Sequence, residues 1–118
     1  MSVPEVSPVT PQTRAAQSAS SAGDILAELQ AVLRSRVGAA PEDSYSAGMV
    51  RDPERVARKV VEEAYEMAVE LQRPGLDRRR VVSESADLLF HVMAALVGAG
   101  VSIDDVLAEL TRRRSSPR

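Results

Sequence analysis

The sequence predicts an all-α fold: an antiparallel bundle of about four helices per chain, completed by homodimerisation. Apolar residues recur at helical spacing in four stretches, and no stretch alternates apolar and polar residues as a half-buried strand would. Two of the expected helices, 53–72 and 78–98, each carry an apolar arc of about 200°. The other two helices are too short to cover such arcs, so a second copy is expected to complete the bundle.

Length and composition exclude several classes of protein. The 118 residues allow one domain at most, with a modest core. A net charge of −2 and only three aromatic residues provide neither a basic surface nor a stacking platform for nucleic acid. The lack of cysteine excludes disulfides and thiolate metal sites, and it fits a cytoplasmic protein. No apolar run approaches 18 residues, so no membrane span is expected.

Residues 1–22 are expected to form a disordered N-terminal tail. They are rich in Ser, Pro, Val, Thr and Ala, show no sustained helical period, and contain three prolines. Such a segment buries too little apolar area to offset the entropy lost on ordering it. The all-α domain is expected to cover residues 23–114, and residues 115–118 are expected to fray.

The first helix is expected over residues 24–36, where apolar residues recur at helical spacing. This stripe comprises Ile25, Leu26, Leu29, Val32 and Leu33. Asp24 is a candidate N-cap, and Gly38 is a stop signal. Residues 38–48 are expected to be a loop that contains Tyr45. This tyrosine either belongs to a simple turn or closes over a ligand.

Three further helices have clear start and stop signals. Asp52 caps the second, which runs from Pro53 to about Gln72 and stops at the following Arg-Pro-Gly. Asp77 caps the third, which covers about 78–98 and ends at a glycine. The fourth begins at Ser102, the first residue of a capping box that has aspartate in place of the usual glutamate.

Acidic residues gather on one face of the second helix and one face of the third. The first set is Glu62, Glu63, Glu66 and Glu70, in a wedge of about 100° that also holds Lys59; the second set is Glu84 and Asp87, on a face with Arg80 and His91. Packing the two helices antiparallel would set these carboxylates opposite one another. Oxygen ligands without sulfur suit a hard cation, and Mg²⁺ keeps waters for a phosphate substrate.

Two interpretations of the acidic face remain open from the residues alone. Arg55 and Lys59 lie on the same face, so the second helix by itself favours a solvated, salt-bridged surface. The third helix favours a site, because Glu84 and Asp87 interrupt an apolar run that has no basic residue between Arg80 and His91. His91 is either a packed histidine or one that Asp87 orients toward a substrate phosphate.

The pattern Glu62-Glu63-x-x-Glu66 followed by Glu84-x-x-Asp87 resembles the signature of the MazG-like all-α nucleoside triphosphate pyrophosphatases. Within that superfamily the chain most resembles the phosphoribosyl-ATP pyrophosphatase family of histidine biosynthesis. Four stretches carry this closer resemblance: Pro41–Ser46, Lys59–Ala64, Ala86–His91 and Gly100–Leu110. The resemblance covers about residues 24–114 and omits the tail.

The resemblance implies Mg²⁺-dependent hydrolysis of phosphoribosyl-ATP to phosphoribosyl-AMP and pyrophosphate. It implies that Glu62, Glu63, Glu66 and Asp87 hold the metal, and that Glu84 is a further ligand or the base that orients water. Lys59 is then the first candidate for phosphate contact, followed by Arg80 and His91, with Tyr45 in the loop.

The sequence departs from the family's pattern at three positions. Val61 stands where glycine is frequent, Ser83 where a further acid is common, and Phe90 where tyrosine is common. None of these changes removes a matched ligand. A house-cleaning nucleoside triphosphate pyrophosphohydrolase and a non-catalytic helical interaction module are the two alternatives.

Overall fold

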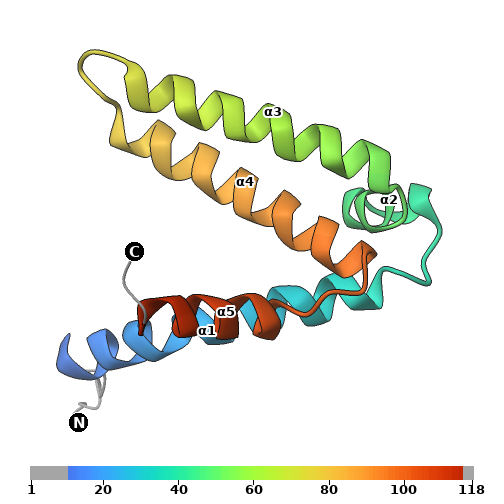
Figure 1. The fold of residues 1–118 in the computed structure, drawn as a ribbon, viewed down its shortest axis with the longest axis horizontal. Coiled ribbons are helices and arrows are strands. Elements are labelled where there is room, and N and C mark those ends of the chain that lie inside the picture. Colours follow the sequence, from blue (N-terminus) through green and yellow to red (C-terminus); the bar gives the residue numbers. More distant parts are fainter. Residues whose placement is uncertain (1–10, 116–118) are drawn as a thin grey trace, which may run out of the picture.

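Every regular element of the protein is a helix in the computed structural model, which describes residues 11–115 (Figure 1). The elements are α1 (Pro11–Ser35), the 3₁₀ helix η2 (Pro41–Asp43), α2 (Tyr45–Val50), α3 (Pro53–Gln72), α4 (Arg78–Gly98) and α5 (Ile103–Arg114). The prediction of an all-α fold is confirmed.

Helices α3 and α4 lie side by side, joined at one end by a short loop of residues 73–77 (Figure 1). The short α2 lies at their other end, where it contacts both of them. Helices α1 and α5 lie below this pair, and the buried Gln30 side chain of α1 accepts a hydrogen bond of 2.7 Å from the Ile103 backbone N–H at the start of α5. The site described below is therefore held by α2, α3 and α4.

The hydrophobic core lies where α1, α2 and α5 meet α3 and α4, at the ends of these two helices that are nearest α2. Its buried members are Leu33, Met49, Val50, Val56, Met93, Ala94, Val97 and Ile103. Gly98 allows the end of α4 to approach α2 closely, because a Cβ atom there would lie 2.7 Å from the Val50 carbonyl oxygen. The core therefore fixes α2 against α4.

The helix boundaries expected from capping residues are observed for α3, α4 and α5. The Asp52 side chain accepts a hydrogen bond of 3.0 Å from the Arg55 N–H, and the Asp77 side chain accepts from the N–H groups of Arg79 and Arg80. The Ser102 hydroxyl accepts from the Asp104 N–H at 3.1 Å. Each cap satisfies backbone donors that a helix start leaves unpaired.

The first helix begins earlier than the sequence suggested. Residues 11–22 were expected to be disordered, but they belong to α1, so Asp24 lies inside the helix and is not its N-cap. Proline is tolerated in the first helical turn, which allows Pro11 to start α1, and the alanines and glutamines that follow favour helix. Residues 1–10 and 116–118 lie outside the described part of the chain.

The expected loop over residues 38–48 was also wrong in part, because it contains η2 and most of α2. The Ser44 hydroxyl caps α2 by accepting a hydrogen bond of 3.0 Å from the Ala47 N–H. Met49 and Val50, which follow, are buried in the core. A helix of six residues gives too short a period to recognise in a sequence, and tertiary packing stabilises it here.

Helix α4 is long and apolar enough to cross a membrane by length and composition alone, with a mean hydropathy of 1.5 in its most apolar window. Glu84 and Asp87 interrupt its apolar run. The helix packs against α1, α2 and α3.

Several large apolar side chains of α3 and α4 are not covered by the described chain. Val61 and Tyr65 on α3 are each 69% exposed, and Val82 and Leu89 on α4 are 68% and 56% exposed. Large apolar side chains left exposed on a helix are available for contact with another protein.

Candidate active site

Three carboxylates of α3 and α4 converge at the middle of the helix pair. One oxygen each from Glu63, Glu84 and Asp87 lie within 4.8 Å of one another. Glu63 comes from α3, whereas Glu84 and Asp87 are one turn apart on α4 and thus reach the same point. The structure therefore brings together three of the five acids predicted for the site.

The buried oxygen of Glu63 fits a cation at this point. Glu63 is only 7% exposed, and its Oε1 atom makes no hydrogen bond within the described residues. An unpaired buried carboxylate oxygen is costly unless a positive charge or a donor satisfies it. Three clustered carboxylates with one unpaired buried oxygen match the ligands that Mg²⁺ prefers.

Lys59 supplies part of the positive charge that the acidic face requires. Its Nζ atom lies 3.5 Å from Glu62 Oε1 and 3.4 Å from Glu63 Oε2. Partial burial acts to lower the pKa of Lys59, but Tyr45, Glu63 and Glu62 outweigh it and raise this pKa above its usual value. Lys59 therefore stays protonated beside the cluster.

Glu62 and Glu66 lie at the edges of the cluster. The side chain of Glu62 is 57% exposed and forms an ion pair with Lys59. Glu66 is exposed, and its charge raises the pKa of Glu84. Both were predicted as metal ligands, but neither belongs to the group of carboxylates that lies within 4.8 Å.

The pKa of Glu84 is raised above its usual value of 4.5. Partial burial is the largest cause, and the negative charges of Glu66, Glu63 and Asp87 add to it. A carboxyl group with a raised pKa in the folded state stabilises the protein fully below pH 4.5. That contribution is lost as the pH rises through the folded-state pKa.

Replacing Glu84 by glutamine should therefore stabilise the metal-free protein at neutral pH. We expect Glu84→Gln to melt at a higher temperature than the wild type at pH 7 in the presence of a chelator, with the difference disappearing below pH 4.5. Glu28→Gln, which changes an exposed carboxylate on α1, serves as the control and should show no such difference. Equal melting temperatures for Glu84→Gln and the wild type at pH 7 would contradict the electrostatic account.

Tyr45 and His91 form a second group beside the acids, on the α2 side. The Tyr45 hydroxyl lies 2.6 Å from His91 Nε2, and His91 Nδ1 lies 2.8 Å from the Asp87 carbonyl oxygen. Since a carbonyl only accepts, Nδ1 carries a proton; in the neutral imidazole Nε2 is then an acceptor, to which the Tyr45 hydroxyl donates. Of the two alternatives, the structure thus has the packed histidine: His91 is buried and is oriented by the backbone of Asp87, not by its carboxylate. Both ring nitrogens are engaged, so His91 positions Tyr45.

The ring of Tyr45 is half exposed and has a cation beside it. The Arg55 guanidinium lies 5.8 Å from the centre of the Tyr45 ring, and Phe90 stacks on the same ring at 6.1 Å. Gly48 leaves room for this arginine, because a Cβ atom at Gly48 would lie 3.1 Å from Arg55 Nη1. The α2 end of the site thus offers an aromatic surface beside a positive charge.

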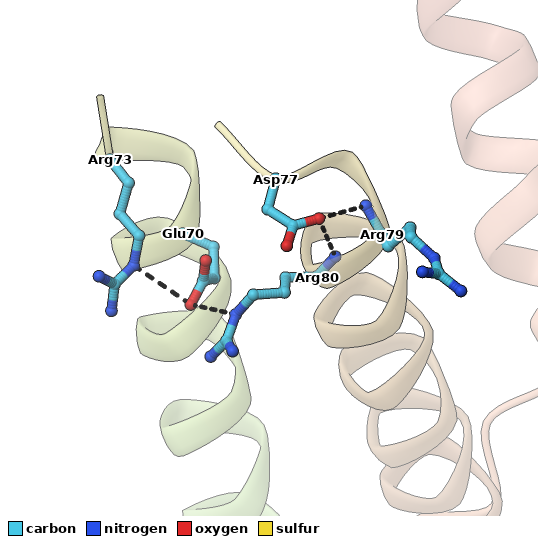
Figure 2. A network of polar contacts seen from close by, with 5 residues as sticks. All are labelled: Glu70, Arg73, Asp77, Arg79 and Arg80. Carbon is cyan, nitrogen blue, oxygen red and sulfur yellow. Dashed lines mark hydrogen bonds and ion pairs between the residues drawn. The ribbon is translucent and has the colours of Figure 1, made fainter. Parts of the chain in front are cut away.

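Arg80 lies at the opposite end of the site, toward the loop that joins α3 and α4. Its Nε donates to Glu70 Oε2 at 3.1 Å, and Arg73 Nε lies 3.3 Å from the same oxygen (Figure 2). Glu70 is 3% exposed, and its Oε1 atom has no hydrogen-bond partner within the described residues. Glu70 was recognised on the acidic face, but its pairing with arginines was missed because Arg73 was interpreted only as part of a helix stop.

Comparison with known proteins identifies a family and several relatives. A sequence model of the family described as phosphoribosyl-ATP pyrophosphohydrolase matches residues 26–114. A protein named phosphoribosyl-ATP pyrophosphatase from Metallosphaera sedula is 44% identical over 91 residues, which cover 76% of this chain and 96% of that protein. Its namesake from Methylobacterium nodulans is 43% identical over 89 residues, covering 75% and 81%. That from Caulobacter vibrioides is 38% identical over 93 residues, covering 79% and 85%.

Proposed function

Because the chain belongs to the phosphoribosyl-ATP pyrophosphohydrolase family and is a hydrolase, we propose that it hydrolyses the α–β phosphoanhydride of phosphoribosyl-ATP. The products are phosphoribosyl-AMP and pyrophosphate, in the second step of histidine biosynthesis in the cytoplasm. The convergence of Glu63, Glu84 and Asp87 on one point beside Lys59 is the observation that carries this proposal.

We propose Mg²⁺ as the cofactor, held by Glu63, Glu84 and Asp87, with Glu62 and Glu66 at the edge of the ligand set. When bound, Mg²⁺ neutralises charge on phosphate oxygens and lowers the pKa of a coordinated water. The unpaired buried oxygen of Glu63 and the mutual repulsion of the carboxylates both favour a cation at this place.

The protein's own groups divide the remaining work. Lys59 contacts a phosphate oxygen and so reduces the repulsion between substrate and acids. Glu84 is assigned the orientation of the attacking water, since one of its oxygens lies within 4.8 Å of those of Glu63 and Asp87. Tyr45, held by His91, orders the α2 end of the site.

A direct assay tests the proposed reaction. Incubating the protein with phosphoribosyl-ATP and Mg²⁺ should release one pyrophosphate for each phosphoribosyl-AMP formed, and chelation of the metal should stop the reaction. Release of single phosphates, or activity that survives the chelator, would contradict the proposal.

We also propose that the exposed apolar side chains of α3 and α4 join two copies into an antiparallel four-helix core. Burying Val61, Val82 and Leu89 against a second copy removes apolar surface from water. We expect light scattering at micromolar concentration to give twice the chain mass of 12.7 kDa.

Two variants test whether Val61 and Val82 lie in the proposed dimer interface. Changing Val61 and Val82 together to aspartate should give a monomer, because two charges would be buried without partners. Val37→Asp is the matched control, since Val37 is also exposed but lies in the turn after α1. A wild-type chain that remains monomeric at micromolar concentration would rule out the dimer.

A further inference from the structure

A pocket of about 340 Å³ extends from the acid cluster toward the loop that joins α3 and α4. Glu66 and Glu84 line its inner part, and Glu70, Arg73 and Arg80 line the part nearer the loop. One pocket therefore has carboxylates at one end and two guanidinium groups at the other. A metal at the first end and an anion at the second would satisfy both.

Glu70 holds the two arginines in place. Its buried Oε2 atom receives Nε of Arg73 from one side and Nε of Arg80 from the other, so the two guanidinium groups flank one carboxylate (Figure 2). The terminal nitrogens of both groups make no hydrogen bond or ion pair within the described residues. The side chains of Arg73 and Arg80 are 58% and 60% exposed, which leaves their free donors accessible.

The charge of this group favours an anion. Two guanidinium groups against one carboxylate leave a net positive charge at the outer end of the pocket. Guanidinium groups bind phosphate through parallel N–H donors, and fixing their orientation beforehand lowers the entropy lost on binding.

We propose that Arg73 and Arg80 form the subsite for the leaving pyrophosphate, with Glu70 as their positioning residue. This inference rests on the proposed function, because it assigns a direction to the substrate across the acid cluster. The β- and γ-phosphates occupy the arginine end, and the nucleoside occupies the end formed by Tyr45 and Arg55.

The contrast between the two ends decides this direction. At the α2 end, Tyr45 and Phe90 provide aromatic ring surface, and the two cations there are already engaged: Arg55 lies over the Tyr45 ring, and Lys59 pairs with Glu62 and Glu63. At the loop end the only aromatic residue lining the pocket is Tyr65, while two cations face the space. Pyrophosphate carries more negative charge than any other part of the substrate, so the end with two arginines suits it best.

Titration calorimetry with inorganic pyrophosphate and Mg²⁺ tests the subsite without requiring turnover. We expect Arg73→Gln and Arg80→Gln each to weaken pyrophosphate binding about tenfold or more, as the loss of a hydrogen bond to a charged group does. Arg79→Gln is the matched control, because Arg79 is next to Arg80 on α4, directs its side chain away from Glu70 and contributes only its backbone N–H to the Asp77 cap (Figure 2). The affinity of Arg79→Gln for pyrophosphate should change by no more than about twofold, since this variant loses only a long-range charge interaction.

Two further measurements sharpen the test. Glu70→Gln should weaken pyrophosphate binding, because the two arginines lose the carboxylate that holds them. If Glu70 only reduces the positive charge of the group, the variant will bind pyrophosphate more tightly, and that result would refute the positioning role. Ribose 5-phosphate as titrant should bind equally well to the wild type, Arg73→Gln and Arg80→Gln. If the two variants instead lose affinity for ribose 5-phosphate and keep their affinity for pyrophosphate, the subsite binds the sugar phosphate and the assignment is overturned.

The other possible results of these measurements also test the subsite. Equal losses in all three arginine variants, or no pyrophosphate binding by the wild type, would overturn the subsite. Should Arg80→Gln fail to fold, as circular dichroism would show, Arg73→Gln still tests the proposal because Arg73 lies beyond the end of α3. If the arginines bind pyrophosphate but phosphoribosyl-ATP is not hydrolysed, the proposed function fails while the anion site stands.

Discussion

Asp87→Asn and Glu63→Gln are each expected to reduce Mg²⁺-dependent hydrolysis by at least about a thousandfold. Both residues belong to the group of carboxylate oxygens within 4.8 Å, and Glu63 provides its buried, unpaired oxygen. A bound metal supplies several kcal/mol of charge stabilisation in a phosphoryl-transfer transition state, which corresponds to roughly three powers of ten in rate. Steady-state rates of pyrophosphate release measure the loss.

The same variants should remain folded, and their metal-free forms should be at least as stable as the wild type. Each removes one negative charge from a cluster in which like charges repel. Asp105→Asn on α5, an exposed carboxylate outside the site, controls for the substitution and should keep full activity. Glu62→Gln tests the edge of the ligand set. Full activity in both Asp87→Asn and Glu63→Gln would contradict the assignment of the metal site.

The second large effect concerns the substrate: phosphoribosyl-ATP should be preferred over ATP by at least about a hundredfold in kcat/KM. Its additional ribose phosphate is an anionic group that ATP lacks, and binding it can position the scissile bond. Losing one charge-assisted phosphate contact costs on the order of 2 kcal/mol, or roughly thirtyfold, and the loss of more than one compounds this.

The Arg55 guanidinium is the cation nearest the Tyr45 ring and is suited to this contact at the α2 end. Side-by-side kinetics with phosphoribosyl-ATP, ATP, dCTP and dUTP measure the preference. Comparable rates on all four, or a preference for a deoxynucleotide, would assign the chain to the house-cleaning pyrophosphohydrolases instead.

The parts of the fold with strong local signals could be predicted from the sequence. Helices α3 and α4 have an aspartate cap at the start and a glycine or proline near the end, and both were found at the expected residues. The start of α1 and the whole of α2 could not be predicted. Residues 11–22 show no apolar period, and α2 depends on the burial of Met49 and Val50 against distant helices.

The candidate site shows the same division. The helical period placed Glu63, Glu84 and Asp87 on facing surfaces, which required only the short connection between α3 and α4. The bond from Tyr45 to His91 and the aromatic contact of Arg55 could not be foreseen, because both depend on how α2 docks. The pairing of Glu70 with Arg73 and Arg80 depends on the conformation of the loop.

The two halves of the site differ in the loop-closure entropy that their assembly requires. The acids come from consecutive helices, so only the residues of one short connection must be ordered to bring them together. Tyr45 and His91 are separated by 46 positions, and their contact is lost whenever α2 detaches. Local opening of α2 therefore leaves the three carboxylates assembled but removes the surface that we propose orders the nucleoside. Amide hydrogen exchange should accordingly be faster in α2 than in the facing parts of α3 and α4.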